Sequence, residues 1–82
     1  MSLLRRDSAS QSKQIRNRIY MIKRDLHGIN ENINVRKSHV NKESLENDER
    51  ERIQTEINML EERKAKLETE KAGLQKQLKG IE

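Results

Sequence analysis

The sequence predicts an all-α protein built as a coiled coil, and three observations support that prediction. Charged residues make up 39% of the 82-residue chain and hydrophobic residues only 30%, which is too little apolar material for a core enclosed from several directions. The chain contains no Pro, so nothing of that kind interrupts a long helix. Two segments repeat apolar residues at alternating spacings of four and three, which indicates a narrow helical seam rather than a disordered polar chain.

The first apolar series lies in the N-terminal half. Its members alternate between the d and a positions of a heptad, with Ile19 at a, and nearly all residues between them are polar. Tyr20 and Met21 are exceptions, and we expect them to widen the apolar stripe. The pattern predicts a helix over residues 13–35, preceded by a flexible tail over residues 1–12. The members of the series are Ile15, Ile19, Ile22, Leu26, Ile29 and Ile33.

The second series lies in the C-terminal half and predicts a helix over residues 43–80. Its d positions are apolar at every heptad from Ile53 onward, whereas two of its a positions are Lys64 and Lys71. A lysine at an a position buries its methylenes, extends its ammonium to water, and biases register or partner choice. The apolar members are Ile53, Ile57, Leu60, Leu67, Leu74, Leu78 and Ile81.

Between the two series the heptad phase shifts by three residues, and short polar side chains cluster there. This favours a turn over residues 36–42, with Asn41 or Ser44 capping the second helix. The expected fold is therefore an antiparallel two-helix hairpin, and the alternative is one long interrupted helix in a coiled-coil oligomer. With this turn, facing residue numbers sum to roughly 80, so that Leu74, Leu78 and Ile81 extend beyond the first helix. A lone hairpin has no closed core, so we expect self-association, most simply as a dimeric four-helix bundle.

Charge is divided unequally between the two halves. Residues 1–42 hold ten Lys or Arg and three Asp or Glu, and residues 43–82 hold eight and eleven, giving net charges of +7 and −3. Opposite signs favour pairing of the two helices with each other. A basic helix also suits nucleic acid, and the candidate contacts are Arg16, Arg18, Lys23 and Arg24.

Several functional classes have no support in the sequence. There is no Cys, and His27 and His39 are not at the i, i+4 spacing of zinc ligands on one helix face. There is no Gly-rich phosphate loop or nucleophile motif, so we expect no enzyme activity, no cofactor, no metal and no small-molecule substrate. No signal peptide and no apolar run of about 18 residues is present, which leads us to expect a cytoplasmic or otherwise intracellular protein without a membrane span.

The leading functional hypothesis is a non-catalytic protein–protein interaction module, such as a scaffold, adaptor or assembly factor. Its partners would be a second copy of the chain, with a dimer favoured, or a helical protein, and the interface would be formed by the two apolar series. A small basic hairpin that binds nucleic acid is the first alternative. A helical chaperone or a partner in secretion or virion assembly is a further one.

Overall fold

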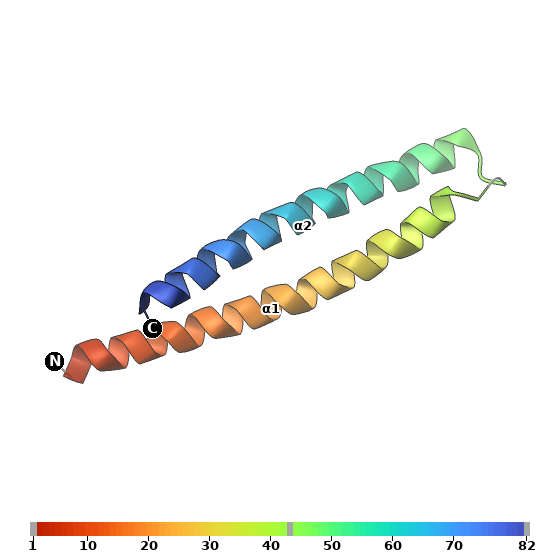
Figure 1. Ribbon diagram of the computed structural model, residues 1–82. Helices are drawn as coiled ribbons and strands as arrows, with labels where there is room; N and C mark the ends of the chain where they lie inside the picture. Colours follow the sequence, from red (N-terminus) through yellow and green to blue (C-terminus); the bar gives the residue numbers. More distant parts are fainter. Residues whose placement is uncertain (1, 43, 82) are drawn as a thin grey trace.

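The computed structural model describes the backbone of residues 2–42 and 44–81 and the side chains of residues 9–42 and 44–81. It is a hairpin of two long helices, α1 (Ser2–Val40) and α2 (Asn47–Ile81), which run antiparallel in contact with each other (Figure 1). The described residues form no strand. The Cα trace measures 67 × 14 × 14 Å, so the molecule is a slender rod with one turn at one end. The antiparallel hairpin predicted from the sequence is confirmed.

The first helix is longer than predicted at both ends. It begins at Ser2 rather than at residue 13, because residues 2–12 contain neither Gly nor Pro and include good helix formers. The expected tail over residues 1–12 is therefore helical from residue 2, while residue 1 and the side chains of residues 1–8 lie outside the described part of the structure. At the other end α1 continues to Val40, which extends the heptad series and packs against the core.

The connection lies later in the chain than the predicted turn over residues 36–42. Lys37 and His39 occupy the last turn of α1, where basic side chains complement the helix dipole. The chain then reverses, and the carbonyl of Lys42 accepts a hydrogen bond from Arg50 Nη2 at 2.9 Å. The first helical bond of α2 runs from the Arg50 N–H to the Glu46 carbonyl at 3.0 Å, so Glu46, and not Asn41 or Ser44, precedes the first helical residue.

Two ion pairs between the helices define their register. Arg18 and Glu70 both occupy g positions, and Lys37 and Glu61 both occupy e positions; g–g and e–e pairs are the flanking contacts of an antiparallel coiled coil. The paired numbers sum to 88 and 98, so facing core residues sum to about 93. The expected sum of about 80 follows from a turn placed too early, over residues 36–42.

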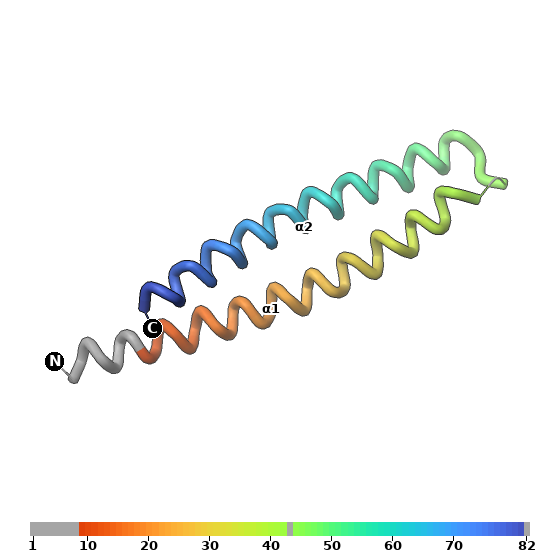
Figure 2. The backbone as a smooth tube through the Cα atoms, viewed as in Figure 1, coloured from red at the N-terminus to blue at the C-terminus, as the bar shows by residue number. Residues whose placement is uncertain are grey.

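This register corrects the expected overhang. Leu74, Leu78 and Ile81 lie opposite α1 rather than beyond it, and Ile81 falls level with Ser12, which is half-buried. It is α1 that continues past the end of α2 (Figure 1), since it begins at Ser2, and Ala9 is exposed there. Figure 2 shows the two helices running side by side from the chain ends to the connection.

The core is a single line of apolar contacts between the helices. Ile22 is fully buried and Ile57 is 1% exposed, and around Ile57 a cluster forms with Ile29 and Ile33. The register places Lys71 opposite Ile22 and Lys64 opposite Ile29, and both lysines are half-buried. Their methylenes therefore cover the isoleucines of α1, as expected for lysine at a core position.

Replacing Ile22 should test how much of the fold depends on this line. Ile22→Ala removes about 2–5 kcal/mol, since the lost side chain is fully enclosed and leaves a cavity. Thermal unfolding followed by circular dichroism should show a large loss of helicity or of melting temperature. Arg24→Ala, on the outer surface of the same helix, should stay within about 0.5 kcal/mol of the parent. Equal melting temperatures for the two variants would contradict the proposed core.

Candidate interaction surfaces

The predicted interface residues lie along the contact between the two helices of one chain. The six in α1 are buried, as is Ile57 in α2. The other members of the second series are only half-buried, because α1 covers each of them from one direction. These half-buried residues are Ile53, Leu60, Leu67, Leu74, Leu78 and Ile81. Packing within the chain thus buries the apolar series of α1 and leaves an apolar margin along α2.

Charged side chains close the two edges of the seam. In the ion pairs recorded between the helices, α1 supplies the cation and α2 the carboxylate, which agrees with the charge difference between the two halves of the chain. The closest is bidentate: Arg18 Nε and Nη2 donate to the two Glu70 carboxylate oxygens at 2.7 and 3.0 Å. Hydrogen bonding to Arg18 lowers the pKa of Glu70, and the same bond, with the attraction of Glu70 and a smaller one from Asp25, raises the pKa of Arg18.

These pairs also divide the surface of the hairpin into two sides. We call the side that carries Lys37 and Glu61 the e side, and the side that carries Arg18 and Glu70 the g side. On the e side the charges are segregated by helix, since Arg16, Lys23 and Lys37 belong to α1 while Glu61 and Glu68 belong to α2. On the g side both helices carry both signs: Arg18 and Asp25 in α1, and Arg63 and Glu70 in α2.

The e side carries an open groove near the chain ends. Its apolar floor is made by Ile19 and Leu78, and Tyr20, Lys23 and Gln75 are among the residues around it, with a volume of about 310 Å³. This volume is at the lower limit for sites that enclose a small molecule.

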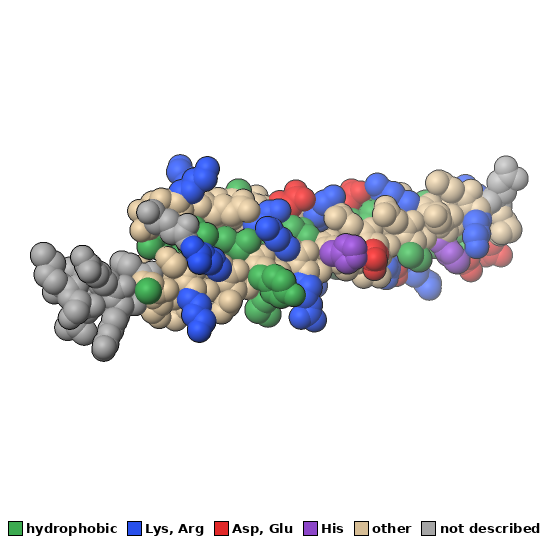
Figure 3. Space-filling view, turned by 60° about the horizontal axis from the view of Figure 1, so that its bottom comes forward, with side chains coloured by type: hydrophobic (Ala, Val, Ile, Leu, Met, Phe, Trp, Pro, Cys, Tyr) green, Lys and Arg blue, Asp and Glu red, His purple; other side chains and the backbone are tan. Residues whose placement is uncertain are grey.

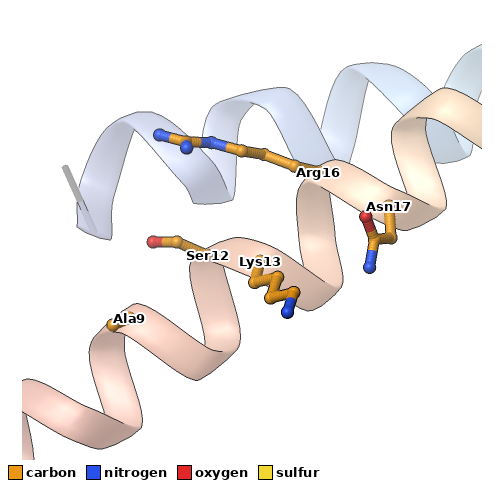
Figure 4. A pocket seen from close by; sticks show the side chains of 5 residues that line it. All are labelled: Ala9, Ser12, Lys13, Arg16 and Asn17. Atoms are coloured by element: carbon orange, nitrogen blue, oxygen red, sulfur yellow. The ribbon is translucent and has the colours of Figure 1, made fainter.

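A second hollow continues along α1 and shares Arg16 with the groove. Figure 4 shows Ser12 and Arg16 directed toward α2, while Lys13 and Asn17 lie on the outer side of α1. Both hollows are open, and they suit an elongated partner better than an enclosed ligand.

Folding concentrates positive charge at one end of the rod. With the boundary at the layer of Leu26 and Leu67, the half that holds the chain ends comprises residues 1–25 and 68–82 and has ten basic and five acidic residues, a net charge of +5. The half that holds the connection, residues 26–67, has eight basic and nine acidic residues, a net charge of −1. On the face drawn in Figure 3, Lys and Arg side chains are spread along the rod, whereas the acidic side chains lie from its middle toward the connection.

The four candidate nucleic-acid contacts do not share one surface. Arg16 and Lys23 lie together on the e side, where Lys13 extends the basic surface. Arg18 turns to the g side and binds Glu70, and Arg24 lies on the outer surface of α1. Position in the chain alone does not distinguish Arg18 from the other three residues, and it does not indicate that Lys13 belongs to the basic surface.

The large apolar side chains that remain exposed are distributed unevenly between the two sides. Tyr20, 66% exposed, lies on the e side, whereas Met21, Val35 and Met59 occupy c positions, which adjoin the g side. The expectation that Tyr20 and Met21 widen the seam is therefore wrong, because consecutive residues of a helix point about 100° apart. Their heptad positions would have placed them on opposite sides.

Within the described residues no cluster of three or more His, Asp or Glu is arranged to hold a metal ion. Among the same residues no helix has the length and apolar content needed to cross a membrane. Comparisons with protein-family models, curated proteins and solved structures gave no match to this chain.

The pKa shift of Glu70 predicts a pH dependence of stability. Because folding lowers this pKa from its ordinary value of 4.5, the ion pair stabilises the fold above that pH and is lost as the pH falls through the lowered value. Glu70→Gln should therefore have a lower urea midpoint than the parent at pH 7, and the difference should shrink at pH 3. Glu62→Gln removes an exposed carboxylate from the outer surface of α2, and its urea midpoint should equal that of the parent at both pH values. A Glu70→Gln deficit that persists unchanged at pH 3 would rule out the ion pair as its cause.

Proposed function

We propose that this protein is a non-catalytic protein–protein interaction module, of the scaffold, adaptor or assembly-factor class, that assembles with a second copy of itself. The observation that carries the proposal is the half-covered apolar margin of α2. From Leu60 to Ile81 every apolar core residue of α2 is only half-buried, and Ile57 alone among the seven apolar members of the second series is buried.

The dimensions of the rod support the same proposal. Two helices in a rod 14 Å across can bury residues only along their line of contact, so isolated hairpins of this kind are of marginal stability. Covering the open margin with further helices adds apolar burial worth about 25 cal/mol for each Å² removed from water. A four-helix bundle formed by two hairpins is the smallest symmetric arrangement that closes the core.

Sedimentation at several concentrations, combined with circular dichroism, tests this function. The parent chain should sediment as a dimer or larger species, and its helicity should rise with concentration as assembly stabilises the helices. Leu67→Asp places a charge opposite Leu26 in the seam and should lower both the helicity and the sedimentation coefficient. Sedimentation of a fully helical monomer for both parent and variant at every concentration would overturn the proposal.

Binding of nucleic acid is a second candidate, and the net charge of +5 on the half with the chain ends favours it. Attraction to phosphates would be driven by Lys13, Arg16 and Lys23, which adjoin the e-side groove. No aromatic platform for stacked bases accompanies them, since Tyr20 is the single aromatic residue of the chain.

If the chain binds nucleic acid, the affinity should fall steeply with salt. Lys13→Ala combined with Lys23→Ala should reduce the slope of log K against log salt by about 2, because two phosphate contacts are lost. Lys37→Ala, in the other half of the rod, should leave the slope unchanged. Absence of binding to duplex or single-stranded DNA or RNA at low salt would dismiss this candidate.

A further inference from the structure

The charges on the g side form a self-complementary pattern. Arg18 and Glu70 make one row across the two helices. Asp25 and Arg63 occupy the next g positions toward the connection, and their numbers also sum to 88, so the register places them level with each other as a second row. The sign alternates along each helix and across each row. We call these four residues the g-side quartet.

We propose that the g side packs against the g side of a second copy in a two-fold symmetric dimer whose hairpins point in opposite directions. This inference rests on the proposed function, because it names the surface and the orientation through which the chain assembles with itself. The quartet, the distribution of net charge along the rod and the contrast with the e side support this dimer.

The quartet matches itself under this symmetry. A two-fold axis that passes between its two rows lays each helix antiparallel on its own counterpart. Arg18 then lies over Asp25 of the second copy, and Glu70 over Arg63 of the second copy, so that each of the four charges meets an opposite charge. Direct superposition of the quartet without rotation would place every charge over its like, which costs affinity.

The position of the axis gives a nearly full overlap of the two rods. It passes beside Met21, and α1 extends from residue 2 to residue 40, so the axis lies near its midpoint. Met21, 54% exposed, then approaches Met21 of the second copy, and Met59 approaches Gly73 of the second copy. A Cβ at Gly73 would meet nothing within 4 Å in the isolated hairpin, so there is room beside Gly73 for the Met59 side chain of the second copy.

Net charge selects the opposite orientation over the parallel one. With the hairpins pointing in opposite directions, the half of net charge +5 lies over the half of net charge −1. With the hairpins pointing in the same direction, the two strongly basic halves would lie together and repel each other. The quartet alone would permit either orientation, so this long-range difference decides between them.

The e side cannot form the same dimer. Its charges are segregated by helix, and laying α1 antiparallel on α1 of a second copy there, about an axis between Arg16 and Lys23, would bring Arg16 against Lys23 of the second copy. Like charges that face each other suppress an association even where apolar groups are available. The e side is thus left outside the dimer, with its groove open.

Cysteine cross-linking tests the surface and the orientation, and the chain contains no other Cys. Under mild oxidation Met21→Cys should give a covalent dimer, since its counterpart lies across the two-fold axis. Two control variants should give little covalent dimer. Tyr20→Cys places the thiol at the adjacent position on the e side, and Ser44→Cys places it in the connection at one end of the rod. Efficient linkage through residue 20 would overturn the choice of surface, and efficient linkage through residue 44 would overturn the orientation.

Charge reversal tests the quartet independently of cross-linking. Asp25→Lys should raise the dissociation constant of the dimer at least about tenfold, because two like-charged contacts with Arg18 replace two opposite ones. Glu68→Lys changes the net charge by the same amount on the e side and should leave the constant within about twofold of the parent. Equal weakening by both variants would contradict the role of the quartet.

The outcomes separate this inference from the proposed function. A parent chain that is dimeric by sedimentation but links through residue 20 retains the proposed function and loses the inference. A parent chain that stays monomeric at every concentration loses both.

Discussion

The contact between the two apolar series determines everything else in this molecule. With so few large apolar residues, the chain buries them only by laying one helix along the other, and the alternating spacing of four and three makes that contact continuous. Ile22 and Ile57 are the most enclosed side chains along this line, whereas Ile53 and Ile81 at its two ends are only half-buried. The length of the rod, the position of the connection and the two charged sides all follow from the register in which the two apolar series pair.

The lysines in the second series show how a seam can tolerate charge. Lys64 and Lys71 lie opposite isoleucines and are half-buried, so their methylenes provide apolar surface where the sequence has no leucine. A lysine half-buried in this way can extend its ammonium to water while its stem stays covered. The cost is a thinner apolar layer on α2, and the half-covered margin that supports our functional proposal is the direct result.

The sequence predicted the hairpin and the residues of its core, because heptad spacing reports directly on which face of a helix is buried. It did not predict the register. Polar residues from Asn30 onward suit both a turn and an exposed helix surface, and only the packing of Val40 against the core decides that α1 continues. An error of a few residues in the turn is doubled in the pairing, which is why the expected overhang of Ile81 was wrong.

The surfaces were harder to predict than the core. Arg16 and Arg18 are two residues apart in the chain, yet they face different sides, and Arg18 binds Glu70 from the other helix. Counting charge by halves of the chain showed that the helices attract each other. The same count does not show that the turn brings the basic start of α1 beside the lysines at the end of α2, because that proximity depends on the register of the folded hairpin.

The uneven charge along the rod gives the protein a permanent electric dipole moment directed along its long axis. A rod of this kind does not approach a charged surface in random orientations, because the field turns it before contact is made. The basic end should lead toward any anionic partner, and the connection should trail. Encounter is therefore biased in direction by the folded charge distribution alone, and added salt would remove that bias before it altered the helices.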